Sequence, residues 1–132
     1  MIRDPLNILL NVTSTDEEKI RKSREVVGSV TFLDNVSGCP ANVFNLGADG
    51  SNCVVGWTVQ NGKYVDIYIA AEGGVNAYNS CRQLFFGCAN MTYVDFGDAF
   101  HTEGCDDMYR MFSGCYYLKA IDLSGFDTSD VL

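Results

Sequence analysis

Short stretches of alternating hydrophobic and polar residues run through residues 29–70 and predict β-strands. Residues 29–33 are mostly β-branched or apolar, which favours a strand. Two further stretches, 53–59 and 64–69, flank Gln60-Asn61-Gly62-Lys63. Asn-Gly between two such stretches predicts a hairpin, because both residues tolerate a positive φ. We therefore expect a small antiparallel sheet in this part of the chain.

The polar residues that precede this sheet predict a helix. Ser14 with Glu17, or Thr15 with Glu18, has the spacing of a capping box. Acidic residues come first and basic residues follow, as the helix dipole favours. Apolar positions are sparse in this segment, so we expect a mostly exposed helix that ends near Gly28.

From about residue 77 the hydrophobic pattern repeats itself. A shift of 27 residues superimposes Cys81 on Met108, Leu84 on Met111, Phe85 on Phe112, Gly87 on Gly114, Cys88 on Cys115, Met91 on Leu118, Val94 on Ile121 and Asp95 on Asp122. A shift of 26 residues continues the match with Phe100 on Phe126, Thr102 on Thr128 and Cys105 on Val131. A period in the twenties is typical of a solenoid with one strand and one helix or turn per unit.

The second unit illustrates the elements expected in each repeat. Two acidic residues open a predicted helix over residues 106–112, as a helix N-terminus favours. Three apolar residues would share one face of it at i, i+3 and i+4, namely Met108, Met111 and Phe112. A short strand is expected around residues 118–123, whose core residues would be Leu118, Ile121 and Leu123.

These patterns predict an α+β fold: a short leucine-rich-type solenoid, with a strand and a helix or turn per repeat, behind an N-terminal antiparallel β cap. The expected organisation is a tail and exposed helix over residues 1–28 and a hairpin-containing cap over residues 29–76. Residues 77–132 would form two leucine-rich-type repeats, of which the last is incomplete.

The charge of the chain is −8 and is unevenly distributed. Residues 28–132 contain four basic and twelve acidic side chains, so this part repels phosphate backbones and disfavours a nucleic-acid partner. No stretch has the ~18 continuous apolar residues of a membrane helix, so we expect no membrane insertion. The N-terminal residues also lack the features of a secretory signal peptide.

The six cysteines do not predict a zinc site or a catalytic thiol. No C-x-x-C pair is present, and His101 is the single histidine that could serve as a ligand or a base. Cys88 and Cys115 occupy equivalent repeat positions, which indicates small, buried, reduced apolar residues.

Two acidic features have the residue types of chemical sites but lead to no assignment. Asp95 and Asp122 share one repeat position, but a repeated outward-facing strand residue explains them more simply than a carboxylate pair for glycoside hydrolysis. Residues 127–130 lack the spacing of a calcium loop, so helix capping is the favoured interpretation. We therefore expect no enzyme activity, no metal and no cofactor.

The repeat resembles one known family. Met111-Phe112-Ser113-Gly114-Cys115, then Leu118, then the segment from Ile121 to Ser129 are similar to the BspA-like leucine-rich-repeat surface-protein unit, which has the form MFxGCxxLxxLDLSxFDTSxV. Residues 84–105 are a looser copy, for example with Met91 in place of leucine. The resemblance implies a bacterial protein, at the cell surface or secreted, that binds other proteins or host components. It carries over no catalytic residues.

Strand alternation also predicts a partner face. If Val65, Val94 and Ile121 point inward, their neighbours point to the other side of the sheet. The outward residues are Tyr64, Asp66, Tyr93, Asp95 and Asp122, with Tyr116 and Tyr117 near the edge. Tyrosines among acidic residues are typical of a protein-binding surface, although ordinary surface tyrosines are an equally good explanation.

Two functions follow as hypotheses. One is a non-catalytic protein–protein interaction or adhesion module of a bacterial surface protein, whose partner is a protein or a host-surface component. The other is a structural spacer or scaffold that presents an adjoining domain. An incomplete last repeat would also leave its end open, so we expect a homodimer in which a second copy covers Ile121, Leu123, Phe126 and Val131.

Overall fold

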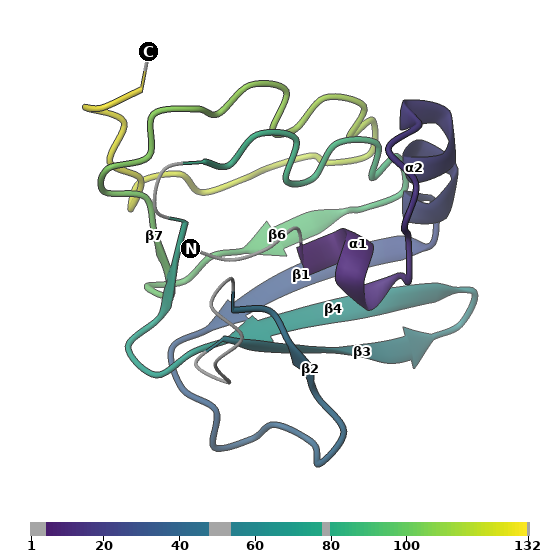
Figure 1. The fold of residues 1–132 in the computed structure, drawn as a ribbon, viewed down its shortest axis with the longest axis horizontal. Helices are drawn as coiled ribbons and strands as arrows, with labels where there is room; N and C mark the ends of the chain where they lie inside the picture. Colours follow the sequence, from purple (N-terminus) through teal and green to yellow (C-terminus); the bar gives the residue numbers. More distant parts are fainter. Residues whose placement is uncertain (1–4, 48–53, 78–79, 132) are drawn as a thin grey trace.

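The computed structural model of the chain describes residues 5–47, 54–77 and 80–131 (Figure 1). Its elements, in chain order, are α1 (Pro5–Leu9), α2 (Glu17–Arg24), β1 (Val27–Leu33), β2 (Phe44–Asn45), β3 (Val55–Asn61), β4 (Tyr64–Ala70), β5 (Val75–Asn76), β6 (Tyr93–Asp95) and β7 (Phe100–His101). Five of the strands form one sheet in the order β2-β3-β4-β1-β6, and β5 pairs with β7 in a second, two-stranded sheet.

The predicted hairpin is confirmed: β4 begins at Tyr64 as expected, and β3 extends closer to the turn than expected. β3 and β4 pair antiparallel, and Asn61 lies opposite Tyr64, so the loop consists of Gly62 and Lys63 alone. Gly62 has a φ of 64°, as the first residue of a two-residue type II′ turn requires. Cys53, the first residue of the predicted strand, lies outside the described residues.

The expected antiparallel cap is wrong, because the main sheet is mixed. β1 pairs in parallel with both β4 and β6, while β3 pairs antiparallel with β2 and β4. A tight turn sets the direction of β3 against β4, whereas β1 reaches β4 through a long connection that imposes no such reversal. β6 belongs to the repeating part of the chain, yet it pairs with β1 of the expected cap.

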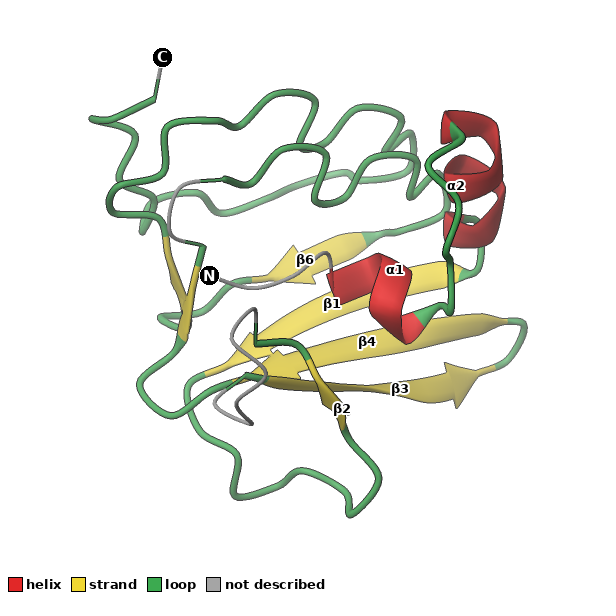
Figure 2. Cartoon of the chain, in the orientation of Figure 1, coloured by secondary structure: helices red, strands yellow, loops and turns green. Residues whose placement is uncertain are grey.

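The predicted fold class, a leucine-rich-type solenoid with a helix or turn in each unit, is also wrong: the structure is a mixed sheet with few helices. Among the described residues both helices lie before β1, and the segments that follow β5 are strands and turns (Figure 2). In particular, where a helix was expected over residues 106–112, Asp107 forms a β-bridge with Ser80 and residues 109–112 form a turn. The predicted strand over 118–123 is also missing, and Leu123 is 41% exposed instead of in the core.

Hydrogen bonds explain why no helix forms in the first of two runs of turns. We call residues 80–88 the first run and residues 107–115 the second run. The backbone N–H groups of the first run alternate in direction: Cys81 donates to Asp107 O at 2.8 Å, and Leu84 donates to Cys81 O at 3.1 Å. Because every second amide bonds to the neighbouring run, a continuous i→i−4 helical ladder cannot form.

The backbone also bends at matching points of the two runs. Gln83 and Arg110 both have a φ of 54°, which no right-handed helix allows, and Gly87 and Gly114 have φ values of 80° and 81°. The two runs therefore share one conformation.

Phenylalanine rings connect the sheet to the two runs. Phe32 of β1 contacts the rings of Phe85, Phe96 and Phe100 at centroid distances of 4.7–6.4 Å. Phe85 of the first run stacks on Phe112 of the second run at 5.4 Å. The repeat spacing seen in the sequence thus brings equivalent aromatic residues into contact in one core.

Helix α2 is present but differs from the prediction at both ends. Asp16, and neither Ser14 nor Thr15, is the N-cap, and its carboxylate accepts the N–H of Glu18 at 2.9 Å. The helix ends at Arg24 instead of near Gly28, and β1 already begins at Val27. No helix in the described parts of the chain is long and apolar enough to cross a membrane.

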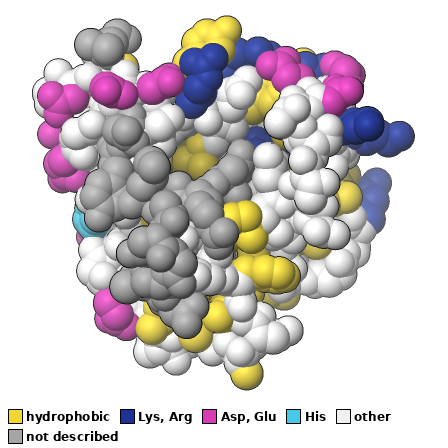
Figure 3. Space-filling view, viewed as in Figure 1, with side chains coloured by type: hydrophobic (Ala, Val, Ile, Leu, Met, Phe, Trp, Pro, Cys, Tyr) yellow, Lys and Arg dark blue, Asp and Glu magenta, His cyan; other side chains and the backbone are white. Residues whose placement is uncertain are grey.

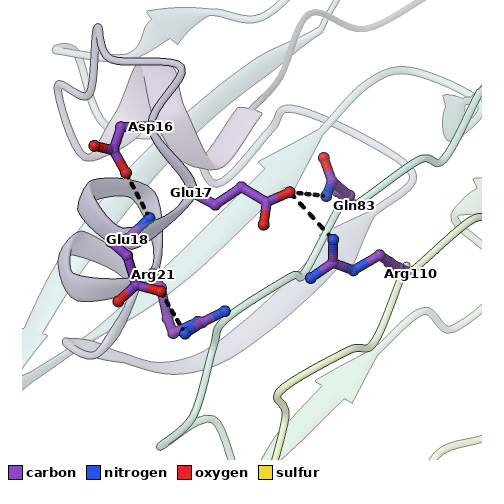
Figure 4. A network of polar contacts seen from close by, with 6 residues as sticks. All are labelled: Asp16, Glu17, Glu18, Arg21, Gln83 and Arg110. Atoms are coloured by element: carbon purple, nitrogen blue, oxygen red, sulfur yellow. Dashed lines mark hydrogen bonds and ion pairs between the residues drawn. The ribbon is translucent and has the colours of Figure 1, made fainter.

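Side chains tie α2 to the two runs (Figure 4). One carboxylate oxygen of Glu17 accepts from Gln83 Nε2 at 3.4 Å and from Arg110 Nη1 at 3.1 Å. Gln83 belongs to the first run and Arg110 to the second, so a single helix residue contacts both.

Candidate binding face

Strand register places the predicted face on one side of the main sheet. Ser29 of β1 lies opposite Asp66 of β4 on one side and opposite Tyr93 of β6 on the other. Residues directly paired across neighbouring strands point to the same face, so the three side chains form a row. Val30 and Val94, one residue further along, point to the core and are buried.

A hollow of about 460 Å³ opens beside this row. We call it the tyrosine hollow, and its lining residues are Gly28, Asn61, Tyr64, Asp66, Asn90, Thr92, Tyr93 and Tyr117. The structure thus brings together three of the five predicted residues. Asn61, Asn90 and Thr92 were not predicted as site residues, because they lie at a strand end or in a loop, where no hydrophobic period locates them.

Two hydrogen bonds fix the Asp66 carboxylate within the hollow. Ser29 Oγ donates to Asp66 Oδ1 at 2.8 Å, and Asn61 Nδ2 donates to Asp66 Oδ2 at 3.1 Å. Ser29 is buried, so it holds its hydroxyl in one position. Both donors are neutral, and therefore they orient the carboxylate without a compensating positive charge.

The aromatic rings at this hollow remain accessible. Tyr93 is 49% exposed and Tyr117 is 59% exposed, while Tyr64 is half-buried. Gly28 allows Tyr64 to come close, because a Cβ at position 28 would lie 3.2 Å from Tyr64 Cβ. A cation can bind next to an exposed ring and a carboxylate at the same time, because the ring face and the negative charge both attract it.

Backbone contacts hold the loop before β6 at the rim of the hollow. Asn90 Nδ2 donates to Glu25 O at 2.9 Å, and the Thr92 amide donates to Gly28 O at 3.0 Å. These bonds connect the loop to the C-cap of α2 and to β1, so the rim is held in place before a ligand binds.

The other two predicted residues lie in a different place. Asp95 and Asp122 line a second hollow of about 470 Å³, together with Asp98. Hydrogen bonds from Ser124, through its side chain and its backbone N–H, lower the pKa of the exposed Asp122 carboxyl. The predicted face is thus divided into two hollows, with Tyr93 of β6 at one and Asp95 of β6 at the other.

The cysteines that the structure describes are free thiols. Cys88 is fully buried, as predicted, whereas Cys115 is half-buried and burial raises its pKa to about 11. Burial also raises the pKa of Cys81, whose Sγ lies 3.4 Å from Cys105 Sγ. Protonated thiols are weak nucleophiles, so these positions favour packing over covalent chemistry.

The single histidine, His101, lies in strand β7. Its Nε2 lies 2.7 Å from Gly73 O, so the ring is engaged with the backbone of the preceding turn. Across the described residues, no group of three or more His, Cys, Asp or Glu side chains is arranged to hold a metal ion.

Comparison with known proteins gives no match, so any functional proposal starts from the geometry of the hollows. No protein-family model matches the chain. No curated protein matches it, and no solved structure matches it either.

Proposed function

We propose that the chain is a non-catalytic protein-interaction module and that the tyrosine hollow binds its partner. The observation that carries this proposal is the gathering of Tyr64, Tyr93 and Tyr117 around the fixed Asp66 carboxylate. Tyrosine is enriched at protein interfaces, because its ring provides apolar area and its hydroxyl a hydrogen bond. The resemblance to BspA-like surface repeats supports a partner that is a protein or host-surface component, and a location at the cell surface or outside the cell.

The charge of the hollow and of the chain favours a basic partner. A lysine or arginine of the partner would lie against the Tyr93 or Tyr117 ring and near the Asp66 carboxylate. The net charge of −8 would also attract such a segment and repel nucleic acid. On the face drawn in Figure 3, basic and acidic side chains lie together around α2, and further acidic side chains line the opposite edge.

A titration with basic and acidic peptides tests the proposal. The probes are a short synthetic peptide in which arginine alternates with serine, and the same peptide with glutamate in place of arginine. We expect the arginine peptide alone to shift the NMR signals of residues around Tyr93 and Tyr117. Binding should weaken as salt is added, because exposed charge interactions are screened.

Variants of the hollow sharpen this test. Asp66→Asn keeps the shape of the side chain but removes its charge, and Tyr93→Ala removes one ring. Each is expected to raise the Kd about 5- to 10-fold, which corresponds to the ~1–1.4 kcal/mol of one cation–π or ionic contact. Tyr116→Ala is the matched control, because Tyr116 is 80% exposed and does not line the hollow. Equal affinity for all four proteins would exclude the tyrosine hollow as the binding site.

The predicted homodimer through the C-terminal end stays a prediction. Leu123 is 41% exposed there and would supply apolar contact area. Light scattering after size exclusion measures the mass in solution and decides between monomer and dimer.

A further inference from the structure

The pairing of the two runs is directional. At every second residue the first run donates a backbone N–H to the second run, and the second run supplies the carbonyls. The four bonds, of 2.8–2.9 Å, join Cys81 to Asp107, Gln83 to Tyr109, Phe85 to Met111 and Gly87 to Ser113. The edge of the second run that faces the first is therefore an acceptor edge.

The opposite edge of the second run carries the matching donors. By the 27-residue repeat, the equivalents of the four donating residues are Met108, Arg110, Phe112 and Gly114. Within the described part of the chain, none of these four N–H groups has a hydrogen-bond acceptor. The intervening amides are used inside the run, for example Ser113 N to Arg110 O at 3.3 Å. Because the two runs share one conformation, the four N–H groups point away from the first run.

An apolar groove of about 490 Å³ adjoins this donor row. Its lining residues are Met108, Met111, Phe112, Ser113, Leu123, Phe126 and Thr128. In the pairing of the two runs, the ring of Phe85 stacks on Phe112, so an aromatic contact accompanies the backbone bonds. Apolar side chains beside unpaired amides match the chemistry of a polypeptide, which offers carbonyls and apolar side chains together.

We infer that this edge, which we call the donor edge, binds a polypeptide segment of another protein that supplies backbone carbonyls at every second residue. The segment also places apolar side chains in the groove. The first run binds the second run by the same chemistry, so the chain itself contains a model of the complex.

A second copy of the chain does not supply these acceptors. A two-fold pairing of donor edges would set N–H groups against N–H groups. A head-to-tail copy would have to offer the corresponding carbonyls of its first run, which include those of Leu84 and Phe86. Both carbonyls already accept from Arg24 Nη1, at 3.3 and 2.9 Å, and Arg24 is buried at the end of α2.

Hydrogen exchange of the full chain gives the first test. In the free protein, the amides of Met108, Arg110, Phe112 and Gly114 are expected to exchange at least about tenfold faster than the four donating amides of the first run. Equal protection of the two sets in the monomer would show that the donor edge is already satisfied, and the inference would fail.

A peptide titration gives the second test. The probe is a synthetic peptide with the sequence of residues 106–118, which is the segment that the first run binds, and a scrambled peptide is the control. We expect the probe alone to slow exchange at the four amides and to shift their NMR signals. Binding of both peptides, or shifts elsewhere in the chain, would overturn the inference.

Groove variants separate this edge from the tyrosine hollow. Leu123→Glu introduces a charge at the exposed rim of the groove and is expected to weaken probe binding at least tenfold. Tyr116→Glu, at an exposed position outside the groove, is the matched control, and Tyr93→Ala should leave probe binding unchanged. If protection of the four amides instead rises with protein concentration and without peptide, a second copy covers the edge and the inference is wrong.

Discussion

The buried Arg24 provides the sharpest test of how α2 stabilises the fold. Its side chain is 1% exposed. Nη1 donates to the carbonyls of Gln83, Leu84 and Phe86 at 2.9–3.3 Å, and Nη2 donates to Asn7 Oδ1 at 3.2 Å. One guanidinium therefore satisfies three backbone acceptors of the first run. We predict that Arg24→Met, which keeps most of the side-chain volume, strongly destabilises the protein.

The magnitude follows from the carbonyls that lose their donor. Gln83 O also accepts from the Phe86 N–H at 3.2 Å, so Leu84 O and Phe86 O are the two left without a partner. A buried polar group that loses its partner costs ~1–3 kcal/mol, so these two cost at least ~2 kcal/mol. Removal of the buried charge recovers part of this, because the guanidinium no longer has to be desolvated. We expect a loss of about 2 kcal/mol in the free energy of unfolding, which also lowers the Tm.

Urea unfolding followed by circular dichroism measures this difference. Arg24→Lys keeps the charge but loses the planar fork, so an intermediate loss is expected. Arg21→Met is the matched control on the same helix: its side chain is 40% exposed and pairs with Glu18 at 2.8 Å, which is worth at most ~0.5 kcal/mol. If Arg24→Met unfolds within ~0.5 kcal/mol of the wild type, the carbonyls do not depend on Arg24 and the reasoning is refuted.

Two further predictions concern a turn and a carboxylate. Gly74→Ala should lower the free energy of unfolding by ~2–3 kcal/mol, because φ is +100° and the new Cβ would lie 2.5 Å from His101 Nε2. Gly73→Ala is the control: its φ is +78° and the space around it is open, so it should lose only ~1 kcal/mol. Equal losses for the two variants in urea unfolding would contradict this. Hydrogen bonds from the Ser129 side chain and N–H lower the pKa of Asp127, so their stabilisation is present above the unfolded pKa of ~4 and is lost as pH falls through the folded pKa. Ser129→Ala should raise the Asp127 pKa in an NMR titration, and an unchanged value would refute the assignment.

The local residue types made the hairpin predictable, whereas the strands that pair with β1 could not be predicted from them. Gly62 sets the turn between β3 and β4, and a two-residue turn leaves the strands only an antiparallel arrangement. The pairing of β1 with β4 and β6 joins residues that are more than thirty positions apart along the chain. Such pairing depends on the packing of the whole core, and no local residue pattern specifies whether it is parallel.

The same limit explains the error in the repeats. Apolar residues at i, i+3 and i+4 are buried together in a helix, but successive turns bury them together as well. Cys81, Leu84 and Phe85 are buried in turns that have this spacing. The turns differ from a helix in the positive φ of Gln83 and Arg110, and neither glutamine nor arginine predicts that conformation. The turns depend on the hydrogen bonds between the two runs, which the local sequence does not show.

The candidate site was predictable to the extent that it lies on strands. Period-two alternation located Tyr64, Asp66 and Tyr93, because strand residues point alternately to the two faces of a sheet. Asn90 lines the same hollow from a loop, where no hydrophobic period predicts it. Asp95 lines the second hollow and not the tyrosine hollow, because residues at different points along one strand can line different hollows.

The two runs show why a sequence repeat does not make equivalent surfaces. They share side-chain spacing and backbone conformation, yet their outer edges differ in chemistry. Each run has one edge of N–H donors and one edge of carbonyl acceptors, so the first run has its acceptors on the outside and the second run has its donors on the outside. The acceptor side of the first run meets Arg24, whose guanidinium donates to several carbonyls at once while it stays charged. The donor side of the second run meets no such group among the described residues. The neighbours of each run, and not its own sequence, therefore decide which edge is closed by the chain and which can bind a partner.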